Sequence, residues 1–297
     1  MGITRNCTRF LAYAKSKDVS FERTVMLGRQ VLYVTPQEIK SQFEYFKLTS
    51  TLAEAESNFA ESLFHSLGAR VIDSIDYSDF EGATVITDMN EAIPPQLKEQ
   101  YSVVFDGGTL EHVFNFPQAI KNCMDMLKIG GHFIAITPAN NQCGHGFYQF
   151  SPELFFSIFN SENGFELQQL IIGVDLPEKG IRDWYKVKEP AKVKRRVTLT
   201  NSQPTYLMVL ARKIKSTNEL VLKPMQSDYQ NVWEVHNSIK SNNPIETETY
   251  WIFLYRKYVP EILKRIIRKI RNQSSERQEV IKELGFVNPS FFEKLEV

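Results

Sequence analysis

Short apolar blocks recur along most of the chain and are separated by polar, turn-prone stretches. From about residue 24 to 213, blocks rich in β-branched and aromatic residues alternate with segments whose apolar residues recur at helical spacing. The predicted strands cover 24–34, 69–76, 83–87, 101–105, 132–137, 165–172 and 205–212. The predicted helices cover about 36–67, 115–127 and 151–159.

This alternation is typical of an α/β fold, in which helices cover both faces of a mostly parallel sheet. The last two strands have no clear helix between them, which predicts an antiparallel hairpin at one edge of the sheet. The main domain is predicted to span 1–213, with an inserted helix at about 36–50 and a basic insertion at about 175–204. A polar linker at 214–249 and a helical C-terminal extension at 250–297 follow it.

Composition narrows the class of protein. Hydrophobic residues make up 42% of the 297 residues and charged residues 24%, a balance typical of globular domains. The formal net charge is zero, so no global field attracts nucleic acid, and no nucleic-acid partner is predicted. The three cysteines lack the spacing of a disulfide framework or a zinc site. The first 15 residues lack a signal-peptide core and no apolar run could span a bilayer, which predicts a cytoplasmic protein.

Polar residues follow the predicted strands at the positions where α/β sheets bind ligands, outside the carboxyl ends of the strands. Gly28 interrupts the first strand, and Asp76, Asp88 and Asp106 come at the ends of the next three. A carboxylate after the second strand can accept hydrogen bonds from ribose hydroxyls, and one after the third can accept from an adenine amine. Each acid could instead cap a helix or favour a turn, but three in succession favour a ligand.

Several motifs between 71 and 165 carry a family resemblance. They are VIDSIDYS at 71–78, FDGGTLEHV at 105–113, MLKIGG at 126–131, IAITP at 134–138, and a later HG, FSP and GF at 145–146, 150–152 and 164–165. Together they resemble class I S-adenosylmethionine-dependent methyltransferases, of the type that acts on small molecules. The resemblance covers roughly 24–213 and is specific from about 70 to 165.

The resemblance implies a Rossmann-like, seven-stranded sheet and S-adenosylmethionine as cofactor. It implies that Asp76 binds the ribose, that Asp88 and Met89 contact adenine, and that Asp106 and Gly107 line the pocket. The family's glycine-rich first motif is missing here, and only Gly28 stands in its place. The residues after it, Arg29 and Gln30, either contact the methionine carboxylate of the cofactor or only complete a turn.

For catalysis, the natural candidates are His112 and His145, with Glu111 beside them, because histidine titrates near neutrality and methyl transfer requires little beyond positioning and deprotonating the acceptor. Either histidine could instead be structural. Some methyltransferases of this class hold a divalent metal with a Glu-His pair and a later His. The further acid that some of them add is replaced here by Gly108, so no metal is predicted.

The resemblance also implies the acceptor, a small or sugar-linked biosynthetic molecule. A non-catalytic scaffold or regulator of the same fold is the alternative, and a nicotinamide-dependent dehydrogenase is disfavoured because no G-x-G-x-x-G follows the first strand. The basic run 186–196 is either a lid for an anionic acceptor or a solvated loop. The basic amphipathic segment 260–271 either packs against protein or associates weakly with a membrane surface.

Overall fold

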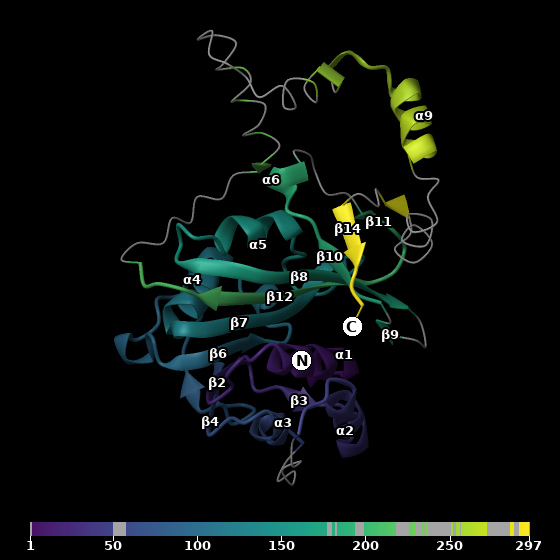
Figure 1. Ribbon diagram of the computed structural model, residues 1–297. Coiled ribbons are helices and arrows are strands. Elements are labelled where there is room, and N and C mark those ends of the chain that lie inside the picture. Colours follow the sequence, from purple (N-terminus) through teal and green to yellow (C-terminus); the bar gives the residue numbers. More distant parts are fainter. Residues whose placement is uncertain are drawn as a thin grey trace.

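A computed structural model describes residues 2–49, 58–176, 180–181, 183–193, 199–217, 257–271, 286–287 and 291–296, with isolated positions between 226 and 255. Its main feature is a ten-stranded sheet (Figure 1). In sheet order the strands are β14 (Phe292–Lys294), β10 (Tyr185–Val187), β8 (Phe165–Leu176), β12 (Thr205–Lys213), β7 (Leu127–Asn140), β6 (Tyr101–Asp106), β2 (Arg23–Leu27), β4 (Val71–Asp76) and β5 (Val85–Ile86), with β9 (Gly180–Ile181) paired to β8.

Strands β5, β4, β2, β6 and β7 are parallel, whereas β12 runs antiparallel between β7 and β8. Numbered along the chain, the seven strands from β5 to β8 therefore lie in the order third, second, first, fourth, fifth, seventh, sixth. The predicted mostly parallel α/β sheet is confirmed. The predicted antiparallel pair is β8 with β12 toward one edge of the sheet, where the short strands β10 and β14 extend it beyond the seven predicted strands.

Helices cover both faces of the sheet (Figure 1). The helices are α1 (Arg5–Ser16), α2 (Pro36–Tyr45), α3 (Glu61–Ser66), α4 (Phe116–Met126), α5 (Pro152–Ile158), α6 (Pro190–Val193) and α9 (Glu261–Arg271), with single 3₁₀ turns at Pro95–Leu97 and Leu110–His112. The sheet has an apolar core on each face, and successive residues of a strand point to opposite cores. In β6, Val103 joins the core under α1 and α3, and Val104 joins the core under α4. All six residues of β6 are buried, including the polar Ser102 and Asp106, as expected for a central strand covered on both faces.

The predicted strand 24–34 is two elements, because Gly28 has a φ of 65° and turns the chain out of β2. Beyond this turn, β3 (Val31–Leu32) pairs with β1 (Gly2–Ile3) instead of continuing the main sheet. The predicted helix 36–67 is also divided. Helix α2 begins with a capping box between Thr35 and Glu38 and ends at Tyr45, and Phe59 forms a bridge with Val31 before α3 begins. Residues 52–57 lie outside the described part of the chain.

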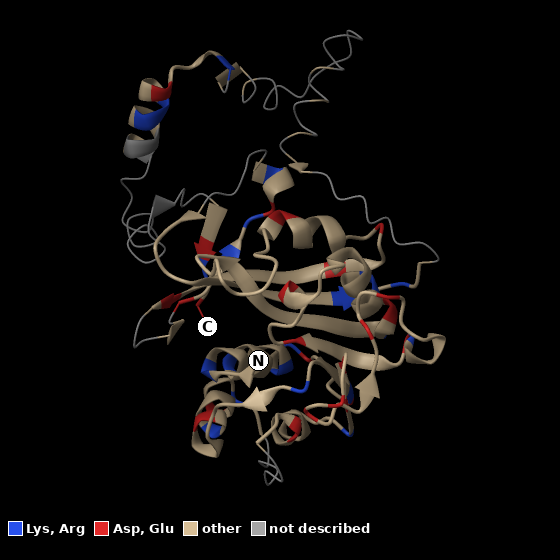
Figure 2. Cartoon of the chain, turned by 180° about the vertical axis from the view of Figure 1, so that it is seen from behind, with Lys and Arg blue, Asp and Glu red and all other residues tan. Residues whose placement is uncertain are grey.

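The C-terminal extension is not purely helical, because β14 returns to the main sheet and β13 (Phe286–Val287) pairs with β11 (Leu199–Thr200). Helix α9 lies apart from the sheet in both views (Figures 1 and 2). Most of the predicted linker 214–249 lies outside the described residues. Residues 194–196 of the basic run lie wholly outside them. None of the helices that the structure describes has the length and apolar character needed to cross a membrane.

Candidate functional site

The residues predicted at strand ends meet at one edge of the sheet. Gly28 directly follows β2, while Asp76 and Asp106 are the last residues of β4 and β6. Asp88 lies two residues beyond β5. Because these strands are parallel neighbours, their carboxyl ends share the edge where α/β sheets bind ligands.

Asp76 and Asp88 differ in how far their carboxylates are already engaged. Asp76 is partly exposed, and its Oδ1 accepts a long hydrogen bond of 3.4 Å from the backbone of Ser78. Oδ1 of Asp88 accepts two hydrogen bonds of 2.8 Å, from the backbone and the side-chain amide of Asn90, which closes a turn. Met89 beside it is buried in the core under α4. Asp76 thus retains the freer carboxylate for a ligand hydroxyl.

Arg29 and Gln30 take the place of the missing glycines, and both side chains make contacts within the protein. Arg29 donates to the Glu61 carboxylate at 2.7 Å and to the backbone carbonyl of Glu81 at 2.9 Å. Gln30 is fully buried and donates to the Leu27 carbonyl at 2.7 Å, but its Oε1 has no hydrogen-bond partner among the described residues. Arg29 therefore braces this turn, and Gln30 leaves a buried acceptor beside it.

The loop after β6 lies directly against this turn. The Thr109 hydroxyl donates to the Leu27 carbonyl at 2.6 Å, which ties the end of β6 to the end of β2. A Cβ added to Gly107 would lie 2.9 Å from Oε1 of Gln30, so any larger residue there would force the buried Gln30 side chain to move. The turn after β2 and the loop after β6 therefore pack closely, with the Gln30 acceptor enclosed between them.

Asp106 shapes this loop from inside the protein. Its side chain is fully buried, and Oδ1 accepts hydrogen bonds from the backbone N–H groups of Thr109 at 2.8 Å and Leu110 at 3.3 Å. Burial, followed by repulsion from Glu111, raises the pKa of the Asp106 carboxyl to about 8. Direct contact between Asp106 and a cofactor stays a prediction; the contacts in the structure are those that hold the loop.

Glu111 and His145 come from different loops and meet at this edge. Oε1 of Glu111 lies 3.3 Å from Nε2 of His145, with the carboxylate buried and the imidazole 49% exposed. The loop after β7 is held there because the backbone N–H of Phe147 donates to the Glu111 carbonyl at 2.7 Å. Gly146 has a φ of 73°, and a Cβ there would lie 2.7 Å from the same carbonyl. The sequence predicted these side chains, but only the loop packing brings them together.

The electrostatics of the pair suit proton transfer near neutrality. Burial raises the pKa of Glu111 to about 7, against an opposing effect of the Thr137 hydroxyl. Desolvation, followed by repulsion from His145, lowers the pKa of His112, whose ring centroid lies 5.1 Å from that of His145. Neither oxygen of Glu111 makes a hydrogen bond among the described residues, so the 3.3 Å contact with Nε2 of His145 is an ion-pair distance rather than a formed hydrogen bond.

The same three side chains could hold a metal ion. One ligand atom each from Glu111, His112 and His145 lies within 4.8 Å of the others. A carboxylate and two imidazoles suit a divalent transition metal with open coordination positions. The sequence predicted no metal, whereas the structure places three possible metal ligands together. A chelation experiment distinguishes a metal site from a site without metal.

Two aromatic residues that the sequence reasoning missed lie next to the histidines. Phe114 and Phe147 are 73% and 67% exposed, with ring centroids 5.8 Å apart. The Tyr148 hydroxyl donates to the Phe114 carbonyl at 2.5 Å, which joins the two loops again. Exposed phenylalanines in loops beside polar residues are the signal that could have identified this surface.

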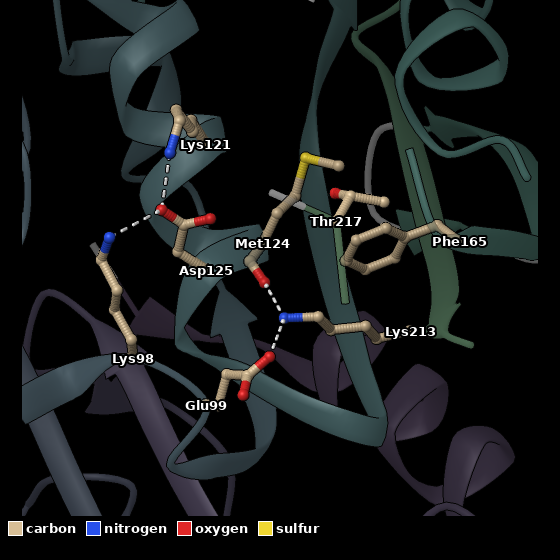
Figure 3. Close-up of a pocket in the computed structure, with 8 residues that line it drawn as sticks. All are labelled: Lys98, Glu99, Lys121, Met124, Asp125, Phe165, Lys213 and Thr217. Atoms are coloured by element: carbon tan, nitrogen blue, oxygen red, sulfur yellow. Dashed lines mark hydrogen bonds and ion pairs between the residues drawn. The ribbon is translucent and has the colours of Figure 1, made fainter. Parts of the chain in front are cut away.

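A separate cavity of about 250 Å³ opens among the opposite ends of the strands, close to the start of β8 and the end of β12 (Figure 3). Lys213 donates there to the carbonyls of Met124 and Leu127 and pairs with Glu99. Both Lys98 and Lys121 pair with Asp125 (Figure 3). Its charged groups satisfy one another, so this cavity is not the candidate site.

No protein-family model matches the chain, and no curated protein matches it in sequence. Solved structures show a remote likeness. A putative methyltransferase from Bacillus halodurans has 11% identity and a TM-score of 0.37, covering 69% of this chain and 99% of that one. Geranyl diphosphate methyltransferase, solved in complex with S-adenosylmethionine, has 12% identity and a TM-score of 0.37, covering 70% and 85%. A branched-chain polyamine synthase from Thermus thermophilus has 12% identity and a TM-score of 0.34, covering 75% and 60%.

With TM-scores below 0.5, these likenesses decide neither the family nor the reaction. The sheet has one antiparallel strand, β12, between β7 and β8, and Asp76 and Asp106 end β4 and β6. What the structure itself shows is an α/β fold, with a mostly parallel sheet between helices.

Proposed function

We propose that the protein is an S-adenosylmethionine-dependent methyltransferase that acts on a hydroxyl or amine of a small molecule. The observation that carries the proposal is the buried Glu111 carboxylate 3.3 Å from the exposed His145, at the sheet edge that also presents Asp76 and Gly28. An acid that orients an imidazole is the arrangement of a general base.

Asp76 would hold the ribose hydroxyls of the cofactor, with Asp88 and Met89 near the adenine. Gly28, Gly107 and the unpartnered Oε1 of Gln30 would lie against the methionine portion. When bound, the cofactor supplies a methyl group on a positively charged sulfur. Only Gly28 remains of the glycine-rich loop. The hydrogen bond from Arg29 to Glu61 would keep the turn after Gly28 in place.

His145 would accept the proton that the acceptor loses as its oxygen or nitrogen gains the methyl group. Glu111 would keep Nε2 of His145 protonated, so that Nδ1 is the basic nitrogen. Phe114 and Phe147 offer exposed aromatic faces beside the base, which suits an acceptor with a ring, such as a sugar-linked intermediate.

Calorimetric titration with S-adenosylmethionine and S-adenosylhomocysteine tests the cofactor. We expect binding to the wild-type protein and a loss of at least about tenfold in affinity for Asp76→Ala, as expected when hydrogen bonds to a charged group are removed. The matched control is Asp79→Ala, because Asp79 is an exposed acid in the same loop. An absence of heat with both ligands would reject the cofactor and favour a non-catalytic scaffold or regulator.

A further inference from the structure

Helix α9 has an inverted pattern of exposure for a helix of a globular domain. Its five apolar side chains are 40–74% exposed, whereas the stem and ammonium group of Lys264 are nearly buried. These apolar residues are Ile262, Leu263, Ile266, Ile267 and Ile270. A helix that packs on its own domain normally turns this face inward. Nothing in the described part of the chain covers this apolar face, so we look for a partner outside it.

The apolar residues form one continuous face. At about 100° per residue, they fall within an arc of about 140°. Lys264 is held from the other side, 2.8 Å from the Glu261 carboxylate and over the ring of Tyr255 at 5.9 Å. Tyr258, just before the helix, is 66% exposed. An aromatic residue with a polar tip beside such a face is typical of an interface between apolar and aqueous phases.

The charges on the helix identify the occupant. The sequence of α9 contains five Lys or Arg residues and one acidic residue, and the whole chain has zero formal charge. On the helical wheel the basic positions flank the apolar arc on both sides. Long basic side chains at the edges of an apolar face can bury their stems and reach anionic head groups.

We propose that α9 docks the protein on an anionic lipid surface, with its apolar face in the interface and its basic residues at the head groups. A second copy of the chain does not fit the charge as well, because two α9 helices face to face would bring like charges together. The helix lies apart from the sheet (Figures 1 and 2), so its apolar face is not covered by the main domain. The proposal is independent of the enzymatic one.

Flotation of the full chain with vesicles tests it. The probes are vesicles of phosphatidylcholine alone and vesicles with a large fraction of phosphatidylglycerol. We expect binding to the anionic vesicles that weakens as salt rises, and much less binding to the neutral ones. Ile266→Asp, at the centre of the face, should lower the partition coefficient by at least about tenfold, the order given by burial of one isoleucine.

The matched control is Ile129→Asp, because Ile129 is a similarly exposed isoleucine, 59% exposed, on strand β7. It should float like the wild type, and circular dichroism should show all three proteins folded. Absence of wild-type binding to anionic vesicles would overturn the proposal, as would an equal loss in the control. Light scattering that shows a dimer dissociated by Ile266→Asp without vesicles would assign the face to a second copy and also overturn it.

Discussion

Replacing Asp106 by asparagine should remove much of the loss of stability that the protein suffers as pH rises. The Asp106 carboxyl is fully buried, and Oδ2 has no hydrogen-bond partner among the described residues. Burial and the nearby Glu111 raise its pKa to about 8 in the folded protein. In the unfolded chain an aspartate titrates at about 3.9. Between these values, the folded protein binds one more proton than the unfolded chain.

The sign and size of the effect follow from this difference in bound protons. The stabilisation is complete below the unfolded pKa and is lost as pH rises through the folded pKa. The slope is about 1.4 kcal/mol per pH unit for each proton, so a single proton retained by the buried Asp106–Glu111 pair lowers the free energy of unfolding by about 3 kcal/mol from pH 5 to pH 7. Asparagine keeps an oxygen for the N–H groups of Thr109 and Leu110 and carries no charge at any pH.

Urea unfolding at pH 5 and pH 7 measures the difference. The wild-type protein should lose about 3 kcal/mol more than Asp106→Asn between the two pH values. The control is Glu91→Gln, which neutralises an exposed acid and should leave the wild-type dependence intact. An equal decline in wild type and Asp106→Asn would refute the argument that a buried neutral carboxyl stabilises the fold at low pH.

Three further predictions concern the other charged groups. Lys213→Met should lower the free energy of unfolding by about 1–3 kcal/mol, because it leaves the buried carbonyls that receive its ammonium group unpaired; urea unfolding against the exposed control Lys215→Met would expose an error if both variants lost equal stability. Once an acceptor is known, Glu111→Gln should reduce kcat/KM by about 100-fold or more. It should also remove the rise in activity near pH 7, because Glu111 ionises there. An unchanged pH profile would exclude Glu111 as the group that positions His145. Treatment with a strong chelator should leave activity unaltered if Glu111 and His145 act as a base pair, whereas loss of activity restored by Mn²⁺ or Zn²⁺ would assign the cluster to a metal.

The sequence by itself determined the elements whose patterning is local. The buried strand β6 reads as an apolar run, and helix α4 shows a clear apolar stripe, so both were predicted nearly to the residue. The acids at 76, 88 and 106 could be predicted because each lies at or just after the end of a strand. Parallel neighbouring strands place these ends at the same edge of the sheet. Glu111 and His112 were found because they share one contiguous motif, and His145 because it lies in a polar loop after a predicted strand.

Tertiary structure decided what depends on distant partners. The position of β12 inside the sheet is set by its pairing with β7 and β8, and no local pattern encodes which edge a strand occupies. The predicted strand 24–34 is likewise divided at Gly28 because its second part, β3, pairs with β1 near the N-terminus and leaves the main sheet. Asp106 is buried at the end of a strand inside the sheet, and Glu111 by the loop after β7, so their raised pKa values arise only in the folded chain. A sequence names the chemical groups, but desolvation and distance, which set their chemistry, exist only in the folded chain.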